Sequence, residues 1–300
     1  MNKGFISVVL LIAGSASAAW AMYSNSFYDA PPTPALEVVN ADGEVVGEYR
    51  APLARDILSE ENAEDIIYGM RLLNETSRLL PDNVGNGLNC NSCHMAQGKR
   101  PLGAPYINTV GDYPKFMPRS QAVLDLTQRI NGCFRRSMNG EPLPDDSAEM
   151  HAMQAYMAWL AKDLEPGQRV NIENMDYFKV GQYTPDPVRG ERIYSQQCAA
   201  CHGQNGEGMK DQFGDYIFPA LWGDESFNIG AGMARLSRAA PFVKHNMPLG
   251  VSLHAPLGQI ELSEQDAVDV SAYFTVKPRP DFPDKIFDWP GVPNPPDSRY

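Results

Sequence analysis

Two copies of the pattern Cys-x-x-Cys-His constrain this chain more than any other feature. They are Cys90-Asn91-Ser92-Cys93-His94 and Cys198-Ala199-Ala200-Cys201-His202. With 5 cysteines and 5 histidines in 300 residues, chance would supply about 10⁻³ copies of the pattern. The pattern is the attachment signal for c-type haem, in which both cysteines bond the porphyrin and the histidine ligates the iron. The sequence therefore predicts two covalently bound haem c groups, one on Cys90 and Cys93 and one on Cys198 and Cys201.

The segments around the two motifs repeat one plan. Apolar residues between Ile66 and Leu80 recur at helical spacing before the first motif, and a helix opened by Ser147 follows it. Residues Gly190 to Tyr194 lead into the second motif, and a last helix begins at Ser263, where Asp266 completes a capping box. Such a helix pair around a haem is the plan of cytochrome c. We expect an all-α chain with two tandem class I cytochrome c-type domains and extended N- and C-terminal segments.

Changes in composition predict the boundaries between these parts. Prolines cluster between the two helical regions, and seven more follow the last helix, from Pro278 to Pro296. Prolines at this density favour extended chain over helix. The expected parts are a signal peptide (1–21), an extended lead-in (22–56), cytochrome c domain 1 (57–165), a linker (166–186), cytochrome c domain 2 (187–277) and a Pro-rich tail (278–300).

The N-terminus has the order of features found in a secretory signal. Lys3 supplies the positive charge, Phe5 to Ala13 the apolar stretch, and Ser15 to Ala19 the small residues, with cleavage expected after Ala18 or Ala21. The alternative is an uncleaved membrane anchor, although the apolar run is short for a spanning helix. In either case we expect the rest of the chain to lie in the periplasm, where bacteria attach haem c.

The overall charge restricts the class of partner. The formal net charge of −12 argues against nucleic acid and favours docking of a basic redox partner. A hydrophobic fraction of 43% is sufficient for a globular core.

Each motif histidine, His94 and His202, supplies one axial ligand to an iron, and a second ligand must come from elsewhere. Methionine is the most common choice and raises the reduction potential. In the second domain Met247 follows His202 by 45 residues and precedes Pro248, which suits a ligand on a rigid loop. Weaker alternatives are Met209, Met233, His245 and His254.

The first domain offers two candidates for the second axial ligand. Met138 follows His94 by 44 residues, nearly the spacing of Met247 in the second domain. Cys133 is the fifth cysteine, and a free thiol in an oxidising compartment is a liability unless a metal or a reaction uses it. A thiolate on iron would lower the potential and needs nearby positive charge. A buried inert thiol is the remaining alternative.

Positive charge is concentrated around Cys133. Two acids, Asp112 and Asp125, lie between Lys99 and Arg136, against seven bases: Lys99, Arg100, Lys115, Arg119, Arg129, Arg135 and Arg136. A solvated basic face is one explanation. The other is an anion site, since guanidinium forks pair well with oxyanions and a thiolate is a sulfur nucleophile. The residues alone thus predict a dihaem redox enzyme that acts on a small anion.

The segment Arg129-Ile130-Asn131-Gly132-Cys133, followed by Arg136-Ser137-Met138-Asn139-Gly140, closely resembles the corresponding segment of dihaem thiosulfate dehydrogenases. The resemblance covers residues 57–278, including both haem motifs and Asn246-Met247-Pro248. It implies that His94 and Cys133 ligate the iron of a catalytic haem in domain 1, and His202 and Met247 that of an electron-transfer haem in domain 2. Asn246 stands where some members carry a lysine ligand, so plain His/Met ligation is implied.

The same resemblance implies the chemistry. Cys133 would be catalytic, and Arg119, Arg129, Arg136 and Ser137 would line the anion pocket. Two thiosulfate ions would be joined to tetrathionate, or the reverse, with electrons passing from haem 1 through haem 2 to a soluble or membrane-bound cytochrome c. The alternatives are a tandem dihaem electron carrier without substrate chemistry, a haem subunit of a sulfur-oxidising complex, and a dihaem peroxidase.

Overall fold

The computed structural model describes residues 35–172, 178–249 and 261–300. The predicted signal peptide, part of the predicted linker and His254 lie outside these residues. Among the helices that are described, none combines the length and the apolar character needed to cross a membrane.

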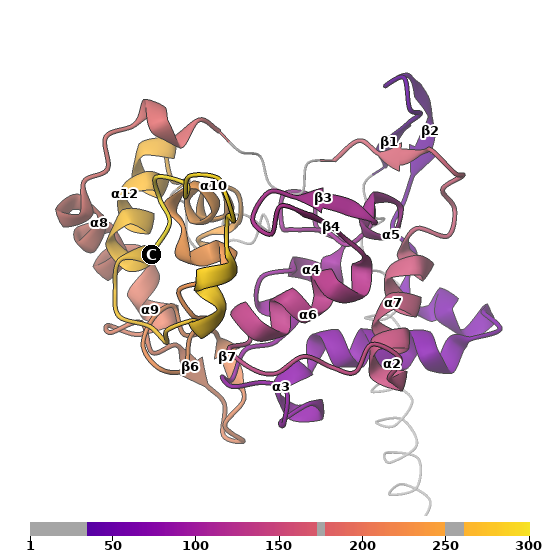
Figure 1. Cartoon of the computed structure of the whole chain (residues 1–300), viewed down its shortest axis with the longest axis horizontal. Helices are drawn as coiled ribbons and strands as arrows, with labels where there is room; N and C mark the ends of the chain where they lie inside the picture. The colour runs from indigo at the N-terminus through magenta and orange to yellow at the C-terminus, as the bar shows by residue number, and fades with distance from the viewer. Residues whose placement is uncertain (1–34, 173–177, 250–260) are drawn as a thin grey trace, which may run out of the picture. The chain divides into compact units, whose positions relative to one another are not determined.

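The first half is built on a pair of packed helices, α2 (Ala63–Asn74) and α7 (Ala148–Leu160) (Figure 1). The predicted cap of α7 is confirmed, because Ser147 Oγ accepts a hydrogen bond from Met150 N at 3.2 Å. The two backbones approach so closely that a Cβ on Gly69 would overlap the carbonyl oxygen of Ala152. Apolar side chains of both helices, among them Ile66, Leu73, Met153 and Tyr156, are buried in one core.

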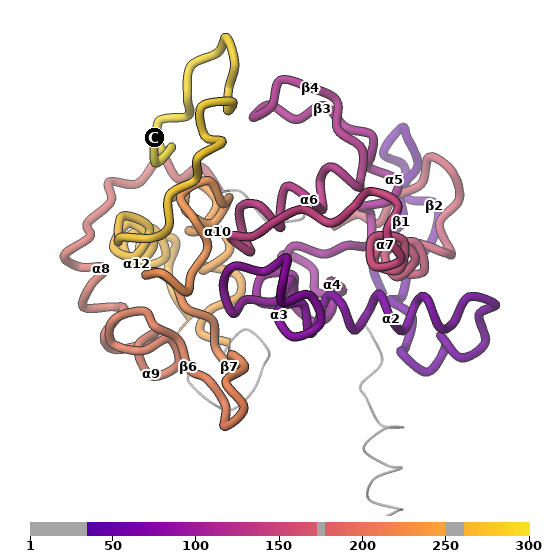
Figure 2. Tube along the Cα trace, turned by 60° about the horizontal axis from the view of Figure 1, so that its bottom comes forward, coloured from indigo at the N-terminus to yellow at the C-terminus, as the bar shows by residue number. Residues whose placement is uncertain are grey.

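Short elements between α2 and α7 carry the first motif. They are α3 (Thr76–Leu79), η2 (Cys90–Ser92), α4 (Met95–Gly98), α5 (Thr109–Asp112), β3 (Lys115–Met117), β4 (Ala122–Leu124) and α6 (Leu126–Arg136). Figure 2 follows the chain from the β3–β4 hairpin into α6. Asp125 Oδ1 accepts from Gln128 N at 2.8 Å and the Gln128 side chain accepts from Asp125 N, so a capping box fixes the start of α6.

The second half of the chain also contains a pair of closely packed, crossing helices. Its elements are η3 (Val180–Gln182), α8 (Pro187–Ile193), η4 (Tyr194–Cys198), α9 (Ala199–His202), β6 (Met209–Lys210), β7 (Tyr216–Phe218), η5 (Gly232–Ala234), α10 (Leu236–Asn246) and α12 (Glu264–Thr275). Helix α12 packs on α8 and α10. Its predicted capping box at Ser263 and Asp266 is present, and a Cβ on Gly190 would overlap the carbonyl oxygen of Asp269.

Small antiparallel sheets add to the expected helices. The lead-in forms strands β1 (Leu36–Val39) and β2 (Val45–Tyr49), and the short helix η1 (Ala54–Ser59) follows them. Strand β5 (Arg169–Val170) pairs with β1, giving the order β2-β1-β5, and Val38 faces Gly47 on one side and Val170 on the other. Val38, Tyr49 and Val170 bury a separate small core there. The sequence does not predict these strands, because two adjacent β-branched residues in a polar stretch are too few to show the alternating pattern of a strand.

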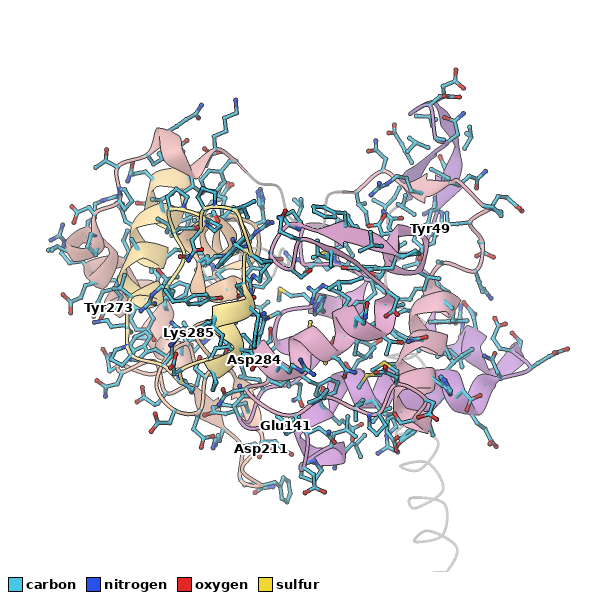
Figure 3. The ribbon with its side chains drawn as sticks, viewed as in Figure 1. Tyr49, Glu141, Asp211, Tyr273, Asp284 and Lys285 are labelled. Atoms are coloured by element: carbon cyan, nitrogen blue, oxygen red, sulfur yellow. The ribbon has the colours of Figure 1, made fainter. Side chains whose placement is uncertain are left out.

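The C-terminal segment is packed against the rest of the chain, where the composition predicted only an extended tail. It contains η6 (Pro283–Phe287), and the side chains of Phe282 and Trp289 on either side of η6 are buried. Trp289 N donates to Arg119 O at 2.6 Å, and Ile229 N to Pro280 O at 3.0 Å. In Figure 3 the labelled residues Asp284 and Lys285 mark η6 beside the end of α6.

Candidate functional site

The first haem motif opens on a mostly apolar cavity. Its lining comes from α2, η2, α6, α7, the loops between them and the second half of the chain: Leu73, Leu88, Asn89, Cys90, Ser92, Cys93, His94, Tyr106, Ile130, Cys133, Phe134, Ser137, Met138, Met157, Phe227 and Met233. Both sequence candidates for the second axial ligand, Cys133 and Met138, are in this lining. Burial raises the pKa of the Cys90 and Cys93 thiols to about 12, and the nearby charge of Cys133 adds to both increases.

The His94 ring is held with one nitrogen available for a metal. Its Nδ1 lies 2.5 Å from the carbonyl oxygen of Ala104, and the ring stacks on Tyr106 with a centroid distance of 4.4 Å. Burial lowers the pKa of His94 to about 4, against the opposing effect of the Ala104 hydrogen bond. A neutral imidazole that donates from Nδ1 leaves Nε2 as the ligand, as in most metal-binding histidines.

Cys133 lies on α6 beside one of the predicted arginines. Arg129, one helical turn earlier, donates from Nη1 to Cys133 Sγ at 2.8 Å, and it also hydrogen-bonds the Tyr113 side chain. Cys133 raises the pKa of Arg129, opposed by burial. A guanidinium at this distance stabilises a negatively charged sulfur. Ser137, one turn after Cys133, lines the same cavity.

Arg119 and Arg136 form a second cluster, separate from the Arg129 contact. Arg136 makes a two-pronged ion pair with Asp288, whose side chain is also 3.9 Å from Arg119 Nε. Both arginines donate to the carbonyl oxygen of Gly230. The structure thus divides the three arginines into two groups, Arg129 at the sulfur and the other two on Asp288, and none of the three is in the lining of this cavity. That they line one anion pocket stays a prediction.

Asp288 and Gly230 were missed by sequence reasoning. Asp288 sits in a segment where prolines predict only an extended tail, and no motif surrounds it. Gly230 lies in a long loop with no periodic pattern. Their roles come from contacts between residues up to 152 positions apart, which local sequence does not report.

The second haem motif has the same arrangement. His202 Nδ1 lies 2.8 Å from the carbonyl oxygen of Pro219, and burial lowers the pKa of His202, so Nε2 is again the available nitrogen. Met247 packs in the same apolar cluster as Cys198 and Trp222. Of the alternatives, Met209 is an exposed residue on β6, and Met233 packs against the apolar clusters of both halves.

These donor sets fit two covalently attached haems. In the first half both motif cysteines and the neutral, oriented His94 line one mostly apolar cavity. In the second half Cys198, which interacts with Cys201, packs in an apolar cluster, and the oriented His202 is buried. Cys90, Cys93 and His94 would hold the first haem, and Cys198, Cys201 and His202 the second. For the first iron the second ligand is predicted to be Cys133, and for the second iron Met247.

Comparisons with known proteins agree with this arrangement. Residues 82–165 match the family described as SoxA/TsdA, cytochrome c domain, and residues 187–275 match cytochrome c. The prediction of two tandem cytochrome c domains with two haems is therefore confirmed.

Curated relatives extend the match over most of the chain. The thiosulfate dehydrogenase of Psychrobacter arcticus is 40% identical over 251 residues, which cover 83% of this chain and 74% of the relative. That of Allochromatium vinosum is 40% identical over 229 residues, covering 75% of this chain and 82% of the relative.

A solved structure is similar in fold. It is the thiosulfate dehydrogenase (TsdBA) of Marichromatium purpuratum in its as-isolated form, with a TM-score of 0.70 and 33% identity over 78% of this chain. The matched region spans 50% of that structure's chain. With relatives of this identity and coverage, the chain belongs to the dihaem c-type thiosulfate dehydrogenase family.

Proposed function

We propose that the protein oxidises thiosulfate to tetrathionate and passes the electrons to a cytochrome acceptor. Two thiosulfate dianions form one S–S bond between their terminal sulfurs, giving one tetrathionate dianion and two electrons. One observation carries the proposal: the Cys133 sulfur, held by the Arg129 guanidinium, lines the same cavity as Cys90, Cys93 and His94. A pure electron carrier needs no anionic sulfur chemistry at that place. The same site could also cleave tetrathionate in the reverse direction.

Side chains of the protein position the two thiosulfate ions for the reaction. Two dianions repel each other, so cationic side chains are needed to bring their sulfurs within bonding distance. Arg129 would receive one thiosulfate at Cys133, and the Arg119–Arg136 pair would receive anionic oxygens nearby. The bound haems supply the electron acceptors, the first for the substrate and the second for the external partner.

Cys133 can also serve as the nucleophile. Its thiolate would bond the terminal sulfur of the first thiosulfate as two electrons leave to the haems. The second thiosulfate would then attack that same sulfur, release tetrathionate and restore the thiolate. Ser137, on the next turn of α6, is placed to donate a hydrogen bond to a bound oxyanion. Mass spectrometry of substrate-treated protein that finds Cys133 always unmodified would contradict this step.

The test of the function is stopped-flow spectroscopy of the oxidised protein mixed with thiosulfate. The wild type should show haem reduction, and Cys133→Ala should show almost none. Met138→Leu is the matched control, since it removes the other candidate sulfur from the same cavity while keeping its volume. Electron paramagnetic resonance should show a thiolate signature that disappears in Cys133→Ala and persists in Met138→Leu. Equal haem reduction in wild type and Cys133→Ala would remove the cysteine from the reaction.

The setting of the reaction is proposed to be the periplasm. The N-terminal order of Lys3, an apolar stretch and small residues supports export, and haem c is attached outside the cytoplasm. Activity that fractionates with the cytoplasm instead of the periplasm or the membrane would contradict the proposal.

A further inference from the structure

The buried carboxylate of Asp288 joins two arginines of the first half to the C-terminal segment. Arg136 Nη2 lies 2.7 Å from Asp288 Oδ1 and Arg136 Nη1 lies 2.9 Å from Oδ2. Arg119 Nε is 3.9 Å from Oδ2, and the Tyr300 hydroxyl donates to the same oxygen. Only 4% of the Asp288 side chain is exposed, so these charges interact at close range with little water between them.

The same two guanidinium groups are braced from other directions. The carbonyl oxygen of Gly230 accepts from Arg119 and from Arg136. The Phe282 ring lies 4.1 Å from the Arg136 guanidinium, and the Trp289 ring 5.2 Å from that of Arg119. A Cβ on Gly230 would lie 2.7 Å from the Phe282 ring and 2.9 Å from Arg136 Nη1, so only glycine leaves room for the cluster.

This braced pair lies next to the cavity of the first haem motif. Gly230 stands between Phe227 and Met233, and both of these side chains line the cavity. Arg136 is one turn beyond Cys133 on α6. The contacts described use Nε and Nη1 of Arg119 and both Nη atoms of Arg136. They leave N–H groups on Arg119 Nη2 and Arg136 Nε for another acceptor.

Asp288 also balances charge in the cluster. Burial, followed by the neighbouring charges of Arg136 and Arg235, lowers the pKa of Arg119 to about 10. Like charges in a poorly hydrated region repel one another, so without a carboxylate between them the guanidinium groups would move apart. Asp288 thus neutralises one of the three positive charges of Arg119, Arg136 and Arg235 and lowers their mutual repulsion.

We propose that Asp288 is a positioning residue for the oxidation of thiosulfate: it holds Arg119 and Arg136 in the orientation in which they receive the dianion. The inference rests on the proposed function. Asp288 itself does not touch the substrate. Its effect passes through the two guanidinium groups, and the C-terminal segment therefore completes the site of the first half.

The test compares Asp288→Asn with Asp284→Asn in the full-length dihaem protein. Asp284 is an exposed carboxylate four positions away on η6, so its substitution gives the same change of charge without touching the arginines. Steady-state kcat and KM for thiosulfate are measured together with the visible haem spectrum and Tm. We expect Asp288→Asn to lower kcat about tenfold, because misplaced reacting groups slow a reaction strongly. KM should change less than kcat, because the loss of a negative charge offsets part of the dianion binding that the displaced guanidinium groups lose. Asp284→Asn should match the wild type.

Asp288→Glu restores the charge and should recover part of the lost kcat. If Asp288→Asn does not fold, Tyr300→Phe provides the measurement, because it removes one hydrogen bond to Asp288 and keeps the charge. It should lower kcat several-fold with KM unchanged. The inference is overturned if the folded variants match Asp284→Asn, if KM rises at constant kcat, or if kcat/KM rises, which would make Asp288 a competing anion. A wild-type protein that does not oxidise thiosulfate at all would overturn the proposed function, and with it this inference.

Discussion

At the scale of single residues, the contact between Arg129 and Cys133 separates this chain from a simple electron carrier. The two residues are four apart on α6, the spacing at which helical side chains meet, and the guanidinium lies 2.8 Å from the sulfur. The cavity that Cys133 lines is mostly apolar, so the charge of Arg129 is poorly screened at the sulfur. Arg129 is therefore placed to stabilise a sulfur anion and to attract a sulfur dianion.

Replacing Arg129 tests this contact. Arg129→Gln removes the charge and keeps an N–H donor, and it should slow the reduction of haem by thiosulfate about 100-fold, the typical effect of losing one charge-stabilising donor. Arg129→Lys keeps the charge without the planar fork and should be less impaired. Stopped-flow spectroscopy measures both rates. A rate for Arg129→Gln equal to that of the wild type would show that the guanidinium does not assist the substrate.

At the scale of elements, each half depends on one glycine where two helices cross. Gly69 on α2 meets the backbone of α7, and Gly190 on α8 meets that of α12. Such close approach sets the distance between the helices that frame each haem motif. The two halves thus share a packing detail as well as a motif.

A methyl group at either crossing should push the helices apart. Gly69→Ala and Gly190→Ala are each expected to reduce the free energy of unfolding by about 1–3 kcal/mol, as overpacked cores do. Gly132→Ala is the matched control, because Gly132 is also helical but has open space around its Cβ position. That control should raise stability by about 0.5–1 kcal/mol. Denaturant unfolding followed by circular dichroism and haem absorbance measures all three variants. Unchanged stability in Gly69→Ala would mean that the crossing can relax.

At the scale of the whole molecule, buried polar residues join the two halves. The Asn86 amide donates to Ser137 O at 3.0 Å and to Ser226 O at 3.1 Å. The Asn228 amide donates to Arg135 O at 2.8 Å, and Asn228 N to Arg136 O at 3.2 Å. Leaving such groups unpaired costs about 1–3 kcal/mol each, so this interface specifies one arrangement of the halves. Electrons can then pass between haem sites that are fixed in position.

The net charge predicts how the molecule meets its acceptor. At −12 the protein should attract a basic cytochrome, and electron transfer to it should slow about tenfold as ionic strength rises from low to well above physiological values. Reduction of a basic and an acidic cytochrome c across a salt series measures this. A salt dependence of the opposite sign for the basic protein would show that a local positive patch, and not the net charge, guides docking.

Much of the fold could be predicted because its signals are local. Cys90, Cys93 and His94 lie within five positions, so the sequence alone indicates covalent haem, and helical periodicity with caps at Ser147 and Ser263 indicates the framing helices. The Arg129–Cys133 contact follows from spacing on one helix. The sheet of β1, β2 and β5 could not be predicted, since β5 reaches β1 from about 130 positions away.

The sequence by itself determined which residues can hold the haems and that a fifth sulfur stands among cationic side chains. Only the tertiary structure decided that Arg119 and Arg136 share the carboxylate of Asp288, and that Phe227 and Met233 of the second half line the cavity of the first motif. The physical reason is range. Covalent attachment and helix capping act between neighbours in the chain, whereas ion pairing and apolar burial act between whatever groups the fold brings together.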